Sequence, residues 1–181
     1  IPPSVIPNFK DVISIDAGTS NSIFGVDGSP IVKDIYYDDA WHTILISGLR
    51  QGGKSYFVLD ITDIQNPSHL FTIAHNSVTD VISLWQADGA RVDYDVGSAP
   101  AEYDYARLGE SWSAPVIMRM EIDEADRWVA LIAGGYNSAI SADYGSDIFI
   151  MDLENEGEII QRISIGDSDG SNQIVNSVPP R

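Results

Sequence analysis

The stretch GSPIVKDIYYDDAWHTILISGLRQGGKSYFVLDITD, from Gly28 to Asp63, decides the fold because the same design occurs again later in the chain. The second copy reads SAPVIMRMEIDEADRWVALIAGGYN at 113–137 and resumes as SDIFIMDLENEGEIIQRISIG at 146–166. A supersecondary unit that is repeated in this way cannot bury its apolar face alone and packs against its copy. The repeat therefore predicts an architecture built from two similar units.

Four matches align the two copies: Pro30 with Pro115, Trp41 with Trp128, Gly48 with Gly135, and Leu-Asp-Ile at 59–61 with Met-Asp-Leu at 151–153. Each copy divides into four runs rich in β-branched and aromatic residues, with Gly, Asp or Pro between them. The runs span residues 29–37, 41–47, 55–61 and 69–74 in the first copy, and 114–122, 127–133, 147–153 and 159–165 in the second. Short strands joined by short turns predict an antiparallel meander.

The third run of each copy, YFVLDI or IFIMDL, is apolar almost without alternation. Such a pattern is typical of a strand that is covered on both faces, and sheets stacked face to face around an axis provide that cover. We therefore predict an all-β fold in which the copies are two four-stranded antiparallel meander blades of a β-propeller fragment. Two blades cannot close a ring, so a β-sandwich is the alternative.

The chain is expected to be a single propeller fragment, 1–181, with a blade at 28–75, an insertion at 76–110, a blade at 111–166 and a C-terminal segment at 167–181. The insertion contains a plausible strand, VISLWQ, followed by an acidic, Tyr-rich stretch that Gly and Pro interrupt. We expect it to be an irregular acidic insertion on the surface.

Composition limits the classes of partner. The chain has 181 residues, a formal net charge of −17 and no cysteine. Such an acidic surface repels phosphate backbones, so nucleic acid is not an expected partner, and disulfides and thiolate metal sites are excluded. No apolar run approaches the roughly 18 residues of a membrane-spanning segment. The N-terminus lacks signal-peptide features and does not begin with Met, so we expect the chain to be a piece of a longer protein. Exposed blade faces make a homodimer a further expectation.

The segment GLRQGGKS, from Gly48 to Ser55, fits the phosphate-loop pattern GxxxxGK[ST]. That loop holds phosphate at the N-terminus of a helix, where free N–H groups point at the anion. Here the strand sequence YFVL follows Ser55, and the matching turn of the second copy has no lysine. We therefore interpret the segment as a hairpin turn, with nucleotide binding through Lys54 as the minor alternative.

Two sets of aspartates are candidates for binding metal. Asp167, Asp169 and Asn172 resemble the opening of a calcium loop, because hard cations bind several oxygens on a tight turn. The other ligands of an EF-hand are absent at the required spacing, so an acidic turn is the alternative. Asp60 and Asp152 end equivalent runs, and their repetition favours carboxylates that accept hydrogen bonds from the following turn over metal or acid chemistry.

The sequence predicts no catalytic residue, and we do not expect an enzyme. His42, His69 and His75 match no metal-ligand spacing; His42 is interpreted as a packed or edge residue. The segment GESWS at 109–113 departs from the nucleophile elbow GxSxG in its last position.

Aromatic residues fall into two groups. Trp41 and Trp128 occupy matched places and are expected to pack between the blades, with ligand stacking as the minor alternative. A second group is expected to form either an adhesive surface or a small core of the insertion: Trp85, Trp112, Tyr94, Tyr103 and Tyr105.

Taken in order, the motifs resemble the C-terminal β-propeller of the PilY/PilC family, the tip-associated adhesins of bacterial type IV pili. They are DGSP at 27–30, WHT at 41–43, the glycine-rich turn at 48–53 and YFVLDITD at 56–63, followed in the second copy by ESWSAPVI, RWVALIAGGYNS and IFIMDL. The resemblance covers roughly residues 22–179. A more distant resemblance to quinoprotein dehydrogenases leads to the alternative function, a propeller that binds pyrroloquinoline quinone.

The family resemblance implies a non-catalytic propeller module that supports pilus assembly and surface attachment, with minor pilins or host and surface ligands as partners. It implies a location at the bacterial cell surface, on the extracellular pilus tip, or in the periplasm. Family members carry a calcium loop of the form DxDxDGxxD, which makes calcium a candidate cofactor. This chain lacks that loop, so the resemblance transfers no calcium ligand to it.

Overall fold

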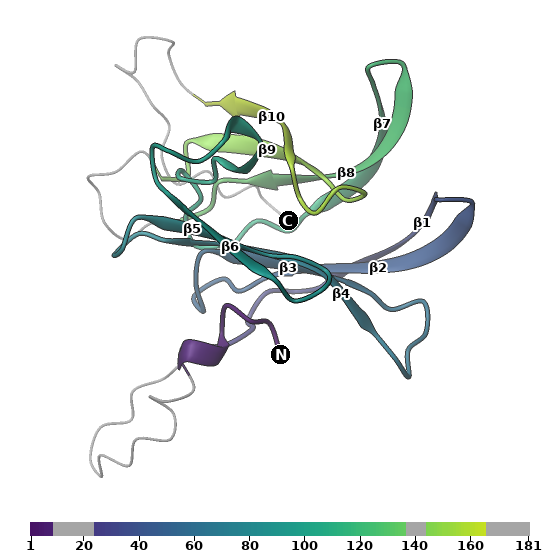
Figure 1. Cartoon of the computed structure of the whole chain (residues 1–181), viewed down its shortest axis with the longest axis horizontal. Coiled ribbons are helices and arrows are strands. Elements are labelled where there is room, and N and C mark those ends of the chain that lie inside the picture. The colour runs from purple at the N-terminus through teal and green to yellow at the C-terminus, as the bar shows by residue number, and fades with distance from the viewer. Residues whose placement is uncertain (9–23, 137–143, 166–181) are drawn as a thin grey trace.

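The computed structural model describes residues 1–8, 24–136 and 144–165 (Figure 1). Its regular elements there are η1 (Ile6–Asn8), β1 (Ile31–Tyr37), β2 (Ala40–Gly48), β3 (Ser55–Asp60), β4 (Ser68–Asn76), β5 (Val81–Trp85), β6 (Arg91–Asp95), η2 (Ala101–Tyr103), β7 (Val116–Ile122), β8 (Ala125–Ala133), β9 (Asp147–Asp152) and β10 (Ile159–Ser164). The eight strands predicted for the two copies are confirmed, and their ends lie within two residues of the predicted ones.

The strands form two antiparallel sheets. β1 to β6 make one sheet in chain order, and β7 to β10 make the other, also in chain order. Every neighbouring pair is antiparallel. The predicted meander topology is therefore confirmed in both copies, and from here on the two sheets are called the first and the second blade.

The insertion at 76–110 is more regular than expected. It contains β5 and β6, which continue the first sheet beyond β4, so the first blade has six strands and not four. Ile82 pairs with Tyr94, and Leu84 pairs with Val92, across the β5–β6 ladder. The sequence RVDYD of β6 alternates polar and apolar residues, which is the pattern of a half-buried strand. Acidic residues and turn residues on both sides concealed this signal.

The two sheets lie one over the other, with β7–β10 covering one face of the first blade (Figure 1). One core of buried residues joins them, to which the first blade contributes Ile44, Ile46 and Tyr56 and the second contributes Ile132 and Phe149. Full burial of an apolar side chain of this size contributes about 1.5–3 kcal/mol. The contact between the blades is therefore a main source of stability for both.

The sheets meet through different faces. Ile44 pairs with Asp60, and Val129 pairs with Asp152, so Ile44 and Val129 hold equivalent places, and we call the face that carries them the front. Ile44 belongs to the shared core, but in the second blade the core residue is Ala130, which neighbours Val129 and points to the back. Front-to-back contact is a head-to-tail arrangement, as between successive propeller blades, whereas a two-fold pair would bring equivalent faces together. The packing favours the propeller over the sandwich.

Front-to-back packing leaves two unlike outer faces, the back of the first blade and the front of the second. The N-terminal segment lies against the back of the first blade (Figure 1), where Val5 packs with Leu49 and Phe57. A homodimer through these outer faces stays a prediction.

Candidate functional site

The segment that fits the phosphate-loop pattern is a hairpin turn, as predicted. β2 ends at Gly48 and β3 begins at Ser55, so a strand and not a helix follows Lys54. The Nζ atom of Lys54 donates a hydrogen bond to Ser77 Oγ at 2.8 Å and lies 3.8 Å from the centre of the Tyr144 ring. Burial lowers the pKa of Lys54. The lysine thus holds the turn against its neighbours.

The N–H groups of this turn are bound by the chain itself. Ser111, from the segment that connects the blades, accepts hydrogen bonds at Oγ from the N–H groups of Leu49 and Arg50, at 2.7 and 3.2 Å. Its hydroxyl donates to the Gly53 carbonyl oxygen at 3.1 Å. A Cβ at Gly48 would lie 2.5 Å from the carbonyl oxygen of Ser111, so this close approach requires glycine. The turn therefore binds the segment that connects the two blades.

Asp60 has the structural role predicted for it. Its Oδ1 atom accepts a hydrogen bond from the N–H of Thr62 at 2.8 Å, and its Oδ2 atom lies 2.7 Å from Nδ1 of His42. Burial alone would raise the pKa of Asp60, but the hydrogen bonds from Thr62 and His42 outweigh it and hold the pKa below its usual value. The carboxylate thus closes the turn after β3 and ties it to β2.

Asp152 repeats this arrangement in the second blade, which confirms the prediction there as well. Its Oδ1 atom accepts from the N–H of Glu154 at 2.8 Å. Its Oδ2 atom accepts from Nη1 of Arg127 at 2.8 Å, where the first blade has a histidine. The side chain of Asp152 is only 3% exposed.

The three histidines lie in the first blade and make structural contacts. The ring of His42 lies 4.2 Å from that of Tyr37, at an angle of 30°. Nε2 of His69 lies 2.8 Å from Thr72 Oγ1, and Nδ1 of His75 lies 3.0 Å from the Leu108 carbonyl oxygen. The interpretation of His42 as a packed residue is confirmed. Burial lowers the pKa of His69 and of His75.

The part of the chain that the structure describes has neither a cluster of metal ligands nor a membrane-spanning helix. Residues 1–8, 24–136 and 144–165 contain no group of three His, Asp or Glu side chains that could hold a metal ion. In these ranges there is also no helix of the length and apolarity needed to cross a membrane. The calcium candidates Asp167, Asp169 and Asn172 lie outside the described residues.

The match of Trp41 with Trp128 is wrong by two residues. The ladder equates Ile44 with Val129, so Trp128 corresponds to Thr43, and Trp41 corresponds to Asp126. The same shift applies to the glycine pair proposed at the other end of the strand. A displacement of two residues keeps every side chain on the same face, so the hydrophobic pattern could not reveal it.

The two tryptophans consequently differ in environment. Trp128 packs against the shared core, and its Nε1 donates to the carbonyl oxygen of Tyr36 in the first blade at 3.0 Å, which confirms blade packing for this residue. Trp41 is 67% exposed. The expectation that Trp41 packs between the blades is wrong for these two blades.

The tyrosines of the insertion join the main core, so neither arrangement expected for them holds. Tyr105 is fully buried there, and its hydroxyl donates to the Gly157 carbonyl oxygen of the second blade at 2.6 Å. Tyr94 and Tyr103 stack with ring centres 5.8 Å apart and pack against the same core. The insertion is therefore part of the contact between the blades.

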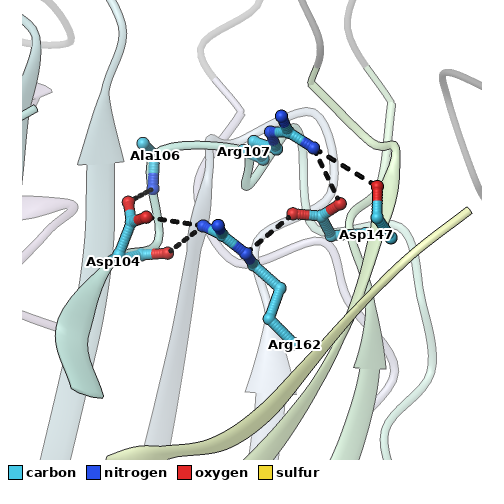
Figure 2. A network of polar contacts seen from close by, with 6 residues as sticks. Asp104, Ala106, Arg107, Asp147 and Arg162 are labelled. Atoms are coloured by element: carbon cyan, nitrogen blue, oxygen red, sulfur yellow. Dashed lines mark hydrogen bonds and ion pairs between the residues drawn. The ribbon is translucent and has the colours of Figure 1, made fainter. Parts of the chain in front are cut away.

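A charge network around one buried carboxylate, at the start of β9, was not predicted from the sequence (Figure 2). The carboxylate of Asp147 is fully buried, and Arg107 and Arg162 reach it at 3.2 and 3.3 Å. Figure 2 shows Arg162 between Asp147 and Asp104, with which it pairs at 2.5 Å. Removing one partner of a buried ion pair leaves an uncompensated charge. The network thus fixes the connecting segment around residues 104–107 to the second blade.

Comparison with solved structures and sequence families agrees with this architecture. A sequence profile described as the PilY1 beta-propeller domain matches residues 14–179. The crystal structure of the Pseudomonas aeruginosa PilY1 C-terminal domain is similar to 95% of the chain, with a TM-score of 0.58 and 27% identity, and the chain covers 27% of that domain.

Two curated relatives extend the comparison. Type IV pilus biogenesis factor PilY1 of Pseudomonas aeruginosa is 30% identical over 142 residues, and the PilY1 homolog of Xylella fastidiosa is 29% identical over 149 residues. The matches cover 78% and 81% of this chain but 9% and 8% of the relatives, so the chain spans less than a tenth of their length. The predicted fold class, two unclosed sheets of a propeller, and the predicted resemblance are confirmed. The chain belongs to the PilY1 beta-propeller domain family.

Proposed function

We propose that this chain is a non-catalytic part of the β-propeller of a type IV pilus biogenesis protein, where it supports pilus assembly and surface attachment. The proposal rests on the family match over residues 14–179, together with relatives that are named for pilus biogenesis. From the same relatives we propose a location at the cell surface, on the pilus tip, or in the periplasm. Minor pilins and ligands on host or other surfaces are the proposed partners.

The contacts of the candidate residues support a non-catalytic role. Lys54, Asp60 and Asp152 hold the turns that position the strands, and the histidines contact neighbouring strands and loops. Lys54, Asp60 and Asp152 were suggested by sequence for nucleotide or metal chemistry, and each has a structural partner. The match to pilus proteins also favours this function over the alternative of a quinone-binding propeller.

A complementation experiment tests the proposal in a bacterium that requires the full-length protein. Deleting residues 28–166 should abolish piliation and attachment, and Asp147→Ala should lower both by destabilising the second blade. Lys54→Met, expressed at the normal level, should leave both close to wild type. Unchanged piliation and attachment after the deletion would refute a pilus function, and loss with Lys54→Met alone would revive nucleotide binding.

Calcium binding by Asp167, Asp169 and Asn172 is a further proposal, supported by the oxygen ligands that these side chains offer. Isothermal titration of the full chain with calcium chloride tests it. We expect heat of binding that is lost in the double variant Asp167→Asn, Asp169→Asn. Equal heats for the two proteins would reject these ligands.

A further inference from the structure

The tip of the β1–β2 hairpin exposes an aromatic pair. Tyr36 and Trp41 lie opposite each other in the ladder, with ring centres 5.5 Å apart in an edge-to-face arrangement. Trp41 is 67% exposed, and Tyr36 is 47% exposed. A contiguous patch of large apolar side chains is more informative than one exposed residue, because such patches mark sites of interaction.

The second blade shows that this patch is not a blade-packing surface. The equivalent positions are Glu121 and Asp126, which also pair across their ladder. They lie on the back of the second blade, the face that packs on the first blade, yet both are exposed and the Asp126 side chain is 50% exposed. The hairpin tip thus extends past the contact between blades. If a further blade packed on the back of the first blade in the same way, Tyr36 and Trp41 would still be accessible to solvent.

Val32 provides the contrast within the same strand. It is 51% exposed, but its equivalent in the second blade, Ile117, is only 5% exposed because it packs against the first blade. Val32 is therefore exposed because it lies at a position that a further blade would cover. The exposure of the aromatic pair, four residues along the strand, does not have this explanation.

The other three tryptophans each have a cation of this chain over the ring. Nζ of Lys33 lies 5.5 Å from the ring centre of Trp128, the Arg50 guanidinium lies 4.4 Å from Trp112, and that of Arg91 lies 5.0 Å from Trp85. Trp41 is the exception, since no basic side chain of the described ranges lies over its ring. An exposed indole face attracts ammonium and guanidinium groups.

Two negative charges lie at the same hairpin tip. Asp38 and Asp39 form the turn between β1 and β2, and both are exposed. We propose that the hairpin tip binds a basic segment of a partner protein, with a lysine or arginine side chain stacked on Trp41 and paired with Asp38 or Asp39. The aromatic face and the carboxylates together complement such a side chain. This inference goes beyond the proposed function and does not depend on it.

Hydrogen bonds to neighbouring segments hold the backbone beside the aromatic pair. Nε1 of Trp128 donates a hydrogen bond to the carbonyl oxygen of Tyr36, and the N–H of Thr43 donates to Thr62 Oγ1 at 2.9 Å. On the same face, Oγ1 of Thr43 donates to the Asp34 carboxylate at 2.7 Å. A preorganised surface loses little conformational entropy on binding.

An NMR titration of the full chain with a short peptide of alternating arginine and glycine tests the proposal. The readout is the four tryptophan indole N–H signals, among which Trp41→Phe identifies the Trp41 signal. We expect this signal to move first and Trp41→Ala to weaken binding about threefold or more. Asp38→Asn with Asp39→Asn should weaken it similarly, and asparagine tolerates the positive φ of 48° and 59° at these positions.

The other hairpin tip is the matched control. Asp123 and Glu124 occupy the same turn at positive φ, 50° and 65°, and changing both to Asn removes the same charge. We expect less than about a twofold change in affinity from that control. Equal losses at both tips, or unaltered affinity in Trp41→Ala, would mean diffuse attraction to an acidic protein and overturn the proposal. So would a neutral oligosaccharide that moves the Trp41 signal when the peptide does not.

Discussion

β3 and β9 occupy the same place in their blades, and their C-terminal ends show what the repeat requires. Each strand ends in an aspartate, Asp60 or Asp152, that accepts a hydrogen bond from the turn that follows. The second partner of the carboxylate is His42 in the first blade and Arg127 in the second. The turn therefore requires the aspartate, while the residue that completes its environment is free to change.

The N-terminal ends of the same strands differ more. β3 begins with Ser55, whose hydroxyl donates to the Ile73 carbonyl oxygen at 2.7 Å. β9 begins with Asp147, which two arginines surround. At this end the first blade thus has a neutral hydrogen bond, whereas the second has a buried carboxylate paired with two partly exposed arginines. All three histidines lie in the first blade. This difference predicts unequal responses of the blades to mutation and to pH.

The largest contrast is expected at the first residues of β3 and β9. Asp147→Ala should lower the free energy of unfolding by about 3–5 kcal/mol, because it removes two charge-assisted contacts, to Arg107 and Arg162, that are worth roughly 1.5–3 kcal/mol each. Ser55→Ala should lower it by about 1 kcal/mol, the net value of a neutral hydrogen bond. Urea unfolding monitored by circular dichroism measures both. Similar losses at the two positions would show that the two strand ends are energetically alike.

The next contrast separates the two tryptophans. Trp128→Ala should cost about 2–3 kcal/mol, somewhat less than a fully buried tryptophan, because it removes packing against the core and the bond to Tyr36. Trp41→Ala should change the free energy of unfolding by no more than about 0.5 kcal/mol, as for an exposed residue. The same unfolding measurement compares them. A large loss from Trp41→Ala would argue against its exposed position.

A smaller contrast is expected at the paired aspartates. Asp152→Ala should cost about 2 kcal/mol and Asp60→Ala about 1 kcal/mol, since the Asp152 side chain is 3% exposed and the Asp60 side chain 14%. A double-mutant cycle with Arg127→Ala isolates the ion pair of the second blade. If Asp60→Ala lowered the free energy of unfolding more than Asp152→Ala, burial would not decide how much each aspartate contributes to stability.

The smallest effect is the response to mild acid, which the first blade should dominate. Burial lowers the pKa of His69 and His75 from 6.5, so the unfolded chain binds protons that the folded chain does not. Their contribution to stability is therefore complete above pH 6.5 and is lost as the pH falls below it, by at most about 1.4 kcal/mol per pH unit and histidine. Unfolding free energies between pH 7.5 and 5 measure this slope. His75→Gln should reduce this slope, and an unchanged slope in that variant would contradict the burial of the His75 ring.

Local patterns were sufficient to predict most of the fold. The strand runs and the turn residues between them located eight strands, and the repeated aspartates indicated turns that accept hydrogen bonds. β6 was missed because its polar alternation lies in an acidic stretch. The register of the second blade was misplaced by two residues, because the period of a strand is itself two and identities such as Trp128 can align at the wrong step.

The polar joints between segments could not be predicted from one sequence. Arg107 and Asp147 are 40 residues apart, and Asp104 and Arg162 are 58 apart. Ser111 accepts hydrogen bonds from Leu49 and Arg50, which lie 62 and 61 residues earlier in the chain. Such pairs form only when the two blades pack together, and the residue pattern within a strand does not predict how the blades pack. The phosphate-loop pattern was interpreted correctly because a strand sequence follows it and because the matching turn of the second copy has no lysine.

Nuclear Overhauser spectroscopy on the methyl-labelled chain tests the front-to-back contact of the two blades most directly. We predict cross-peaks that join the methyl groups of Ile44 and Ile46 to those of Ala130 and Ile132. Cross-peaks from Ile44 and Ile46 to Val129 and Leu131 in their place would show that equivalent faces meet, as in a sandwich, and would contradict the propeller arrangement.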